Sequence, residues 1–329
     1  MKRRTFLQQS LQHTALLPAL TPTLVPALST GRSLAAASVA TATLSGVTRE
    51  VLATSDLQIQ VISDGFMQLP MSMIMPDPAM REAARKLLGS TLDAQQDDAS
   101  MKQVCNITLL SYSDKLVLFD VGAGFNFMPT TGELVGALEA IDISPEDITD
   151  VVFTHAHPDH LWGLLDDFDE LSFPDAQYHI HEREWDYRLD DMTLSQTPEA
   201  RQSFVVGAQN RLPMIEDRIS MFRYGDEVLP GVEAVNTSGH TPGHSAFAIH
   251  SGDTSMMIIG DALTHSLISF AHPKWALAMD QSPDEAVKTR LSLLDRLAVD
   301  KTPIIGFHLS NGGQGYVERL EQAYRFVAA

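Results

Sequence analysis

A cluster of three histidines and one aspartate, packed into six residues, constrains this chain of 329 residues more than any other feature. His155, His157, Asp159 and His160 come directly after a short, mainly apolar run at 148–153. Each buried polar group without a partner costs about 1–3 kcal/mol, so four of them at a strand end are expensive. A bound cation satisfies them together, whereas an ordinary core or surface histidine accounts for only one at a time. The spacing lets His155 and His157 face one metal ion, and lets Asp159 and His160 turn toward a second.

Three further pieces carry the same kinds of side chain. The motif Gly-His-Thr-Pro-Gly-His at 239–244 holds His240 as the expected ligand and His244 in a supporting role. Asp261 ends an apolar run, where an acid is expensive to bury unless it is paired or metal-bound. A bridging carboxylate there would hold two cations roughly 3.5–4 Å apart, and the alternative is a capping aspartate. His308, which follows a last apolar run, is the final candidate ligand.

The pattern of apolar residues predicts an α/β alternation. Strands are predicted at 57–64, 148–153, 232–235 and 303–307, and hairpins at 107–120 and 246–259. Helices are predicted to begin at Ser144 and at Ser282, the second running to about Ala298 with Glu285 in a capping box. The more polar region 183–220 is expected to be helical and to cover the site. Each chemical residue stands where a strand ends, on loops of the kind that carry function.

The first 37 residues are predicted to be a twin-arginine export signal, which leaves a single domain over 38–329. A twin arginine at 3–4 precedes a mildly apolar stretch, and small residues at 34–37 supply a cleavage site. A disordered basic N-terminus is the alternative. We therefore expect a periplasmic or secreted protein.

The charge balance narrows the expected partners. Acidic residues outnumber basic ones by 42 to 23, and loss of residues 1–37, with four basic residues and no acid, takes the net charge from −19 to −23. Such a chain repels phosphate backbones, so nucleic acid is not an expected partner. No run reaches about 18 apolar residues, so no membrane anchor is expected either. The single cysteine, Cys105, excludes an intramolecular disulfide. A small-molecule substrate is therefore the expected binding partner.

Together these motifs resemble those of the metallo-β-lactamase superfamily: HxHxDH at 155–160, GHTPGH at 239–244, Gly-Asp at 260–261 and a late histidine at 308. The resemblance implies a four-layer αβ/βα sandwich with two divalent metal ions at one edge, between the sheets. Zinc is the expected metal, although donors of this type also accept manganese, iron or cobalt. The family pattern places one ion on His155, His157 and His240 and the other on Asp159, His160 and His308, with Asp261 bridging them.

Within the superfamily the chain resembles methyl parathion hydrolase and its relatives. The similarity lies in Lys-Leu-Val-Leu at 115–118, Gly-Ala-Gly at 122–124 and His-Leu-Ser at 308–310, and it ends at 311–314. It implies that a metal-bridging hydroxide attacks a neutral ester, foremost an aryl phosphotriester, and it suggests a homodimer. A lactonase on the same site is the alternative. A β-lactamase, a thioesterase like glyoxalase II and a non-catalytic metal sensor are weaker ones.

The expected roles follow from this mechanism. Asp261 would keep the nucleophile oriented, and Asp159 would shuttle a proton, so both are predicted to be catalytic. The substrate pocket should be apolar, because the substrate is neutral. The side chains predicted to line it, each with an ordinary core or surface role as the alternative, are Phe125, Phe127, Trp185 and His265.

Overall fold

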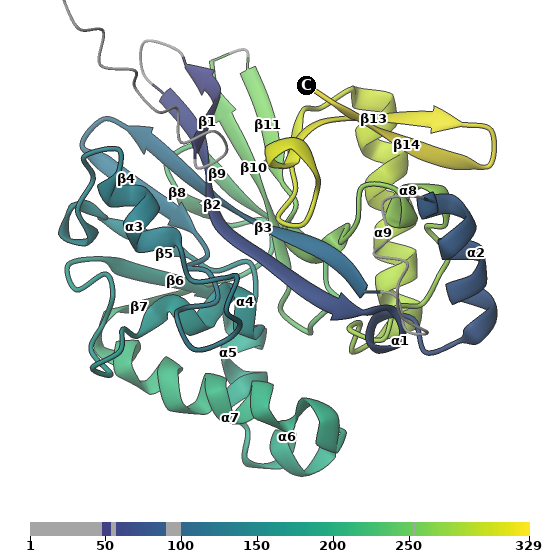
Figure 1. Ribbon diagram of the computed structural model, residues 1–329. Coiled ribbons are helices and arrows are strands. Elements are labelled where there is room, and N and C mark those ends of the chain that lie inside the picture. Colours follow the sequence, from purple (N-terminus) through teal and green to yellow (C-terminus); the bar gives the residue numbers. More distant parts are fainter. Residues whose placement is uncertain (1–47, 54–56, 90–99, 253) are drawn as a thin grey trace, which may run out of the picture. The chain divides into compact units, whose positions relative to one another are not determined.

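A computed structural model describes residues 48–53, 57–89, 100–252 and 254–329 (Figure 1). The described residues belong to one compact unit. The predicted export signal, residues 1–37, lies outside the described residues. No helix in the described part is long and apolar enough to cross a membrane.

The first of two sheets has seven strands that follow one another in chain order. They are β1 (Thr48–Ala53), β2 (Leu57–Pro70), β3 (Ser100–Tyr112), β4 (Lys115–Phe119), β5 (Asp150–Val152), β6 (Gln177–His181) and β7 (Ile219–Phe222). Strands β1 to β4 pair antiparallel, and β4 to β7 pair parallel. The predicted hairpin at 107–120 is confirmed as β3 and β4, with Ser113 in the left-handed region at the turn (φ 53°).

The second sheet also has seven described strands, again in chain order. They are β8 (Glu227–Leu229), β9 (Val232–Asn236), β10 (Ser245–Ser251), β11 (Thr254–Ile258), β12 (Ile304–Ile305), β13 (Gln314–Leu320) and β14 (Ala323–Ala328). All neighbours pair antiparallel except β11 and β12, which are parallel. The long connection between these two contains the helices that cover the sheet.

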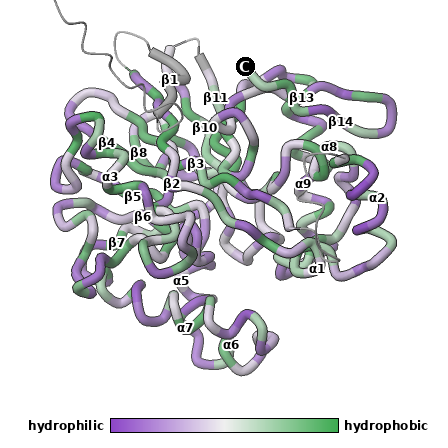
Figure 2. The backbone as a smooth tube through the Cα atoms, in the orientation of Figure 1, coloured by the Kyte–Doolittle hydropathy of each residue, from purple (hydrophilic) through white to green (hydrophobic). Residues whose placement is uncertain are grey.

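The two sheets pack face to face, with helices on their outer faces. The inner core joins side chains of both sheets, such as Phe119 from β4 and Phe247 from β10, whose rings lie 5.2 Å apart. Figure 2 shows hydrophobic stretches along the strands of both sheets. Helices that connect strands of the first sheet bury apolar side chains on its outer face, and α8 and α9 do so on the second sheet. The expected four-layer sandwich is therefore confirmed.

The helices range in length from four residues in α1, α4 and α8 to 18 residues in α9. They are α1 (Met71–Ile74), α2 (Pro78–Leu88), α3 (Leu134–Glu139), α4 (Pro158–Leu161), α5 (Glu182–Leu189), α6 (Asp191–Gln196), α7 (Gln202–Arg211), α8 (Ile268–Ala271) and α9 (Pro283–Asp300). The helical prediction for 183–220 is confirmed by α5 to α7. The helix predicted from Ser144 is only the 3-10 turn Pro145–Asp147. The capping box at Glu285 is wrong, because Glu285 instead accepts a hydrogen bond from Ser238 Oγ at 2.6 Å.

The topology brings distant motifs to one edge. The loops that carry the histidine motifs follow β5, β9, β11 and β12, at the carboxyl ends of these strands. Since β5 belongs to one sheet and the other three to its partner, the motifs meet between the sheets.

Candidate metal centre

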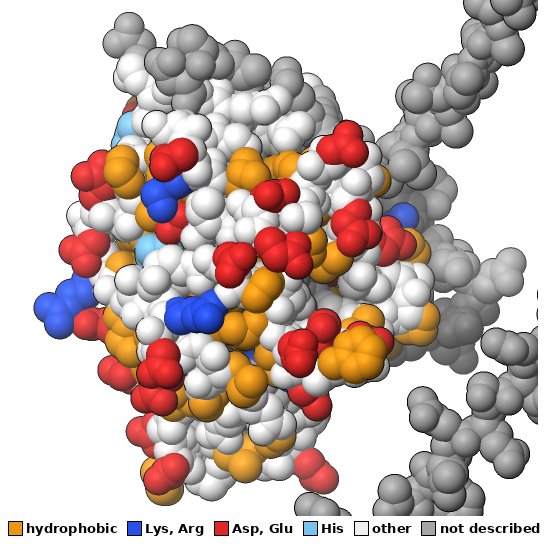
Figure 3. Space-filling model, turned by 90° about the vertical axis from the view of Figure 1, so that its left-hand side faces the viewer, with side chains coloured by type: hydrophobic (Ala, Val, Ile, Leu, Met, Phe, Trp, Pro, Cys, Tyr) orange, Lys and Arg blue, Asp and Glu red, His pale blue; other side chains and the backbone are white. Residues whose placement is uncertain are grey.

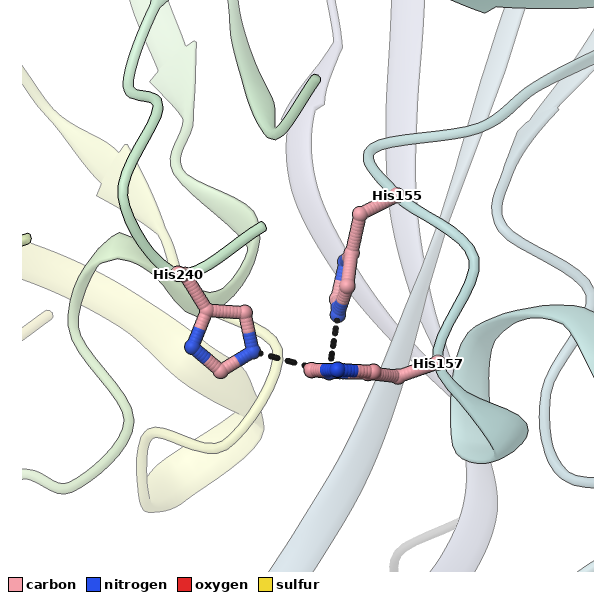
Figure 4. Close-up of side chains that lie close together, drawn as sticks. All are labelled: His155, His157 and His240. Atoms are coloured by element: carbon pink, nitrogen blue, oxygen red, sulfur yellow. Dashed lines mark hydrogen bonds between the residues drawn. The ribbon is translucent and has the colours of Figure 1, made fainter. Parts of the chain in front are cut away.

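Three imidazoles from two loops form the first donor group (Figure 4). His155 Nε2 lies 2.9 Å from His157 Nδ1, and His240 Nε2 lies 3.0 Å from the same atom. All three side chains are buried. Nitrogens bound to one tetrahedral zinc ion at 2.0–2.1 Å would lie roughly 3.3 Å apart, so this spacing is close to that of a ligand set.

Four side chains form the second donor group. His308 Nε2 lies 3.1 Å from Asp159 Oδ2 and 3.4 Å from Asp261 Oδ2. His160 Nε2 lies 3.4 Å from an oxygen of each of the same two carboxylates. Asp261 Oδ2 is also 3.3 Å from His240 Nε2 in the first group. The carboxylate of Asp261 therefore touches both groups, which is the position a bridging ligand requires.

The donor atoms fit two cations because they are poorly satisfied by one another. His160 Nε2 and Asp261 Oδ1 are buried with no hydrogen-bond partner among the described residues. In the first group, one lone pair on His157 Nδ1 cannot serve two neighbouring imidazoles well. Such groups cost free energy when they are left unpaired, and a divalent cation bound by each group would remove that cost.

Two carboxylates hold the imidazoles from outside. Asp120 Oδ2 accepts from His160 Nδ1 at 2.8 Å, and Asp120 in turn accepts from the backbone N–H and the hydroxyl of Thr154, both at 2.8 Å. Burial raises the pKa of the Asp120 carboxyl, although the neighbouring His160 and Thr154 oppose this shift. With Nδ1 taken as a donor, the Nε2 lone pair of His160 faces the site, an arrangement typical of metal-binding histidines.

His240 is held in the same way. Its Nδ1 lies 3.0 Å from Asp280 Oδ1, and Arg290 Nη2 donates to the other oxygen at 2.9 Å. Burial of His240 disfavours its charge, but hydrogen bonds to Asp261 and Asp280 outweigh it and raise the pKa to about 9. Asp280 and Arg290 are both buried, so their charges compensate each other within the protein.

Glu184 joins the two ligand loops from behind. Its oxygens accept from the backbone N–H of Ala156 at 3.0 Å and of Gly243 at 3.1 Å, and Arg188 Nε donates to it at 3.0 Å. Burial would raise its pKa, but Arg188 and the hydrogen bonds lower it overall. The charged carboxylate thereby fixes the loop of His155 against that of His240.

A cavity of about 130 Å³ opens onto these donors. Its polar wall includes His157, Asp159, His240, Asp261 and His308. Gln103, Thr264 and Asp280 are further polar residues on it. The rest is apolar and consists of Met67, Leu69, Met73, Ile74, Phe127, Met128, Phe204, Leu277 and Met279. The site therefore offers a neutral, apolar approach to a polar centre.

Comparison with known protein families agrees with this geometry. Residues 102–307 match the family described as the metallo-beta-lactamase superfamily. The chain belongs to this superfamily. It is accordingly a metal-dependent hydrolase with the metallo-β-lactamase fold, and its two donor groups suggest two metal ions.

Several relatives and solved structures are similar to this hydrolase. It is 28% identical over 172 residues to the uncharacterized protein YobT of Bacillus subtilis (strain 168), over 50% of this chain and 70% of that one. It is 23% identical to the probable metallo-hydrolase Mb2322c of Mycobacterium bovis, over 49% of this chain but only 57% of the relative.

Two of the similar solved structures cover most of the chain. One is AidC, a dizinc quorum-quenching lactonase in complex with its product N-hexanoyl-L-homoserine, and the other is the hydrolase AbOPH of the beta lactamase superfamily. Each has a TM-score of 0.77 and 25% identity, and covers 86% of this chain and 97% of its own.

The hydrolase brings together all seven side chains predicted as ligands, and His244 supports them as expected. His244 Nε2 accepts the backbone N–H of Asp261 at 2.9 Å, and Thr237 Oγ1 lies 2.8 Å from its Nδ1. Burial lowers the pKa of His244 to about 3, so this ring stays neutral and can accept that N–H.

The predicted pocket needs correction at three of its four residues. Phe127 lines the cavity. Phe125 is 49% exposed and lines another groove, at the start of a turn over 125–127. Trp185 is buried in the core outside the first sheet. His265 Nδ1 accepts the backbone N–H groups that begin α8, and its neighbour Thr264 lines the cavity instead.

Four supporting residues carry no signal in the sequence: Gln103, Glu184, Asp280 and Arg290. None belongs to a motif, and each acts by holding a residue in another segment of the fold. The region 183–220 supplies Phe204 to the cavity, but its α5 supports the ligand loops rather than covering them.

Proposed function

We propose that this hydrolase opens the ring of an acylated lactone. The observation that carries the proposal is the apolar cavity that leads directly to the donor atoms, which suits a neutral ester with an apolar chain. The similarity to AidC, described as a lactonase, supports the same substrate class.

The residues present would hold two divalent ions, His155, His157 and His240 one of them and Asp159, His160 and His308 the other, with Asp261 between. When bound, such a pair polarises an ester oxygen and lowers the pKa of water. Asp261 sets the spacing of the two groups. Asp159, on the cavity wall, would accept the proton of the attacking water and return it to the alkoxide that leaves the ring. The apolar wall excludes bulk water from this exchange.

The charges of the cavity favour a neutral substrate. Among the described residues that line it, none is lysine or arginine, and Asp280 is neutralised by Arg290. A substrate carboxylate, such as that of a penicillin or of a glutathione thioester, would find no cationic side chain there. This argues against the β-lactamase and thioesterase alternatives.

An aryl phosphotriester is the second candidate substrate. The rings of Phe127 and Phe204 line the cavity, and aromatic faces of this kind can pack against an aryl leaving group. A nitrophenolate leaving group would need little help from Asp159, because its own pKa is low.

The test compares kcat/KM of the metal-loaded protein on N-hexanoyl homoserine lactone and on a neutral aryl phosphotriester. We expect the lactone to be the better substrate, with activity lost in His157→Ala. A faster phosphotriester reaction would reverse the order of the two candidates. Absence of turnover on both, with metal bound, would refute both.

We further propose export through the twin-arginine route and assembly as a homodimer. Fractionation of expressing cells, with N-terminal sequencing of the product, should find a mature form in the periplasm or medium that begins near residue 38. Light scattering should give twice the chain mass.

A further inference from the structure

We propose that Gln103 recognises a secondary amide on the substrate, by accepting the amide N–H beside the ester. This inference rests on the proposed lactonase function and narrows it to lactones that carry an N-acyl amide. It adds a specificity-determining residue at a position that no motif marks.

Gln103 lies between two segments that carry donor atoms. Its neighbour Val104 presents its carbonyl oxygen 2.8 Å from His308 Nδ1. Its own Nε2 donates to the carbonyl oxygen of Thr264, three residues after Asp261, at 3.2 Å. The residue is 6% exposed and lines the cavity. Gln103 is therefore fixed within the site, next to Val104, whose carbonyl oxygen contacts the candidate metal ligand His308.

The bond to Thr264 also fixes which end of the amide is available. A carbonyl oxygen can only accept, so the side-chain nitrogen of Gln103 must face it and the oxygen Oε1 must point elsewhere. No described residue donates a hydrogen bond to Oε1, and this atom is not among the fully buried unpaired ones. The cavity thus holds a hydrogen-bond acceptor of fixed orientation that can be reached by a bound molecule.

The surroundings make this acceptor selective. Met67 is the cross-strand partner of Gln103 and also lines the cavity, as do Leu69 and Ile74. Among apolar neighbours an unpaired carbonyl oxygen costs free energy, so a substrate that brings an N–H is favoured over one that does not. An N-acylated lactone has such a group next to its ring, whereas an aryl phosphotriester with no N–H lacks it.

The experiment compares two lactones on the metal-loaded full chain. One is N-hexanoyl homoserine lactone, and the other is its ketone analogue, in which a methylene replaces the N–H. We expect the amide to be preferred in the wild type, and Gln103→Met to lower kcat/KM for the amide by roughly 10- to 100-fold while leaving the ketone nearly unchanged. Met67→Leu is the matched control and should affect both lactones alike.

Binding gives a second readout that does not require turnover. Calorimetry with the ring-opened N-hexanoyl-L-homoserine and its ketone analogue should show the same loss of amide preference in Gln103→Met. An equal effect of Gln103→Met on both ligands, or none on either, would overturn the role of Gln103. If neither lactone is hydrolysed, the proposed function fails, while the binding comparison still decides the role of Gln103. If Gln103→Met does not fold, equal affinity of the wild type for the two ligands would overturn the inference.

Discussion

The two ends of β5 carry similar residues that serve different purposes. At its amino end, Asp150 accepts hydrogen bonds from Lys115 at 2.6 Å, Thr149 at 2.7 Å and His179 at 3.0 Å. Beyond its carboxyl end, histidines and carboxylates face one another with unpaired donor atoms. The polar atoms of the first cluster are paired by hydrogen bonds within the protein. Those of the second cluster would be satisfied only by a bound cation. The two clusters contain the same types of residue, so composition alone does not distinguish them. They differ in whether their polar atoms have hydrogen-bond partners within the protein.

The largest effect should come from the same substitution made at both clusters. Asp261→Asn removes the charge that joins the two donor groups, so we expect kcat/KM to fall by roughly 10³-fold or more. Asp150→Asn should leave kcat/KM within about twofold, because it lies at the other end of the strand. Steady-state kinetics with metal in excess measures both. Similar losses in the two variants would remove the distinction between the clusters.

A smaller effect is expected for the carboxylate that holds His240 from outside. Asp280→Asn should weaken metal affinity or activity by roughly 10- to 100-fold, because the ring of His240 loses its charged partner. Competition with a chelator measures the affinity. The exposed Asp284, on the first turn of α9, provides the control Asp284→Asn, which should behave like wild type. Unchanged affinity in Asp280→Asn would show that the pair with Arg290 serves packing alone.

The Asp150 cluster should affect stability in acid. Burial disfavours the ionised carboxylate, but hydrogen bonds from His179, Lys115 and Thr149 outweigh it and lower the pKa from 3.8 to about 2. A lowered folded-state pKa stabilises the protein above pH 3.8, and this contribution is lost as pH falls through about 2. Asp150→Asn should therefore cost up to about 2 kcal/mol at pH 7, and the difference from wild type should shrink toward pH 2. Urea unfolding at pH 7, 4 and 2.5 checks this, and a difference that stays constant with pH would contradict it.

The smallest effect is expected at the cavity wall. Phe127→Ala removes part of the apolar surface, so kcat/KM for a long acyl chain should fall by roughly 10-fold, and less for a short one. Phe125→Ala removes the same ring from outside the cavity and should change neither. Kinetics on a series of acyl lengths separates the two variants. A chain-length dependence in Phe125→Ala would move the acyl site to the neighbouring groove.

The donor side chains could be predicted from the sequence because four of them share one motif, and the other three stand at strand ends in motifs that resemble those of the superfamily. His155, His157, Asp159 and His160 follow one strand, and the topology then brings the other strand ends to the same edge. Many of the strands could be predicted because alternating burial is visible in the sequence, whereas the order of the layers could be expected only from the resemblance to the superfamily.

The cavity wall and the outer supports could not be predicted in this way. Gln103 looks like an ordinary strand residue in the sequence, and its role depends on contact with the loop of Thr264. Glu184 accepts hydrogen bonds from two backbone N–H groups, an interaction that no sequence motif indicates. Phe125 and Phe127 look alike in sequence, but they lie at opposite ends of a turn over 125–127, and only Phe127 lines the cavity. Glu285 likewise accepts a hydrogen bond from Ser238, which is distant in sequence, instead of capping its own helix.

Acidic side chains on the surface can hold cations weakly, apart from the metal centre. Figure 3 shows one face of the molecule, on which aspartate and glutamate side chains clearly outnumber lysine and arginine. Weakly held cations on such a face must be removed by salt before the bound metal is counted, because exposed charges are screened at high ionic strength.

The most direct test is a metal titration followed by activity. The chain is stripped with a chelator, washed at high salt and given zinc in steps, while metal per chain and lactone hydrolysis are measured together. We predict that two ions bind per chain and that activity returns in full only with the second. Activity that survives chelation, or that is complete with one ion per chain, would contradict the two-ion centre.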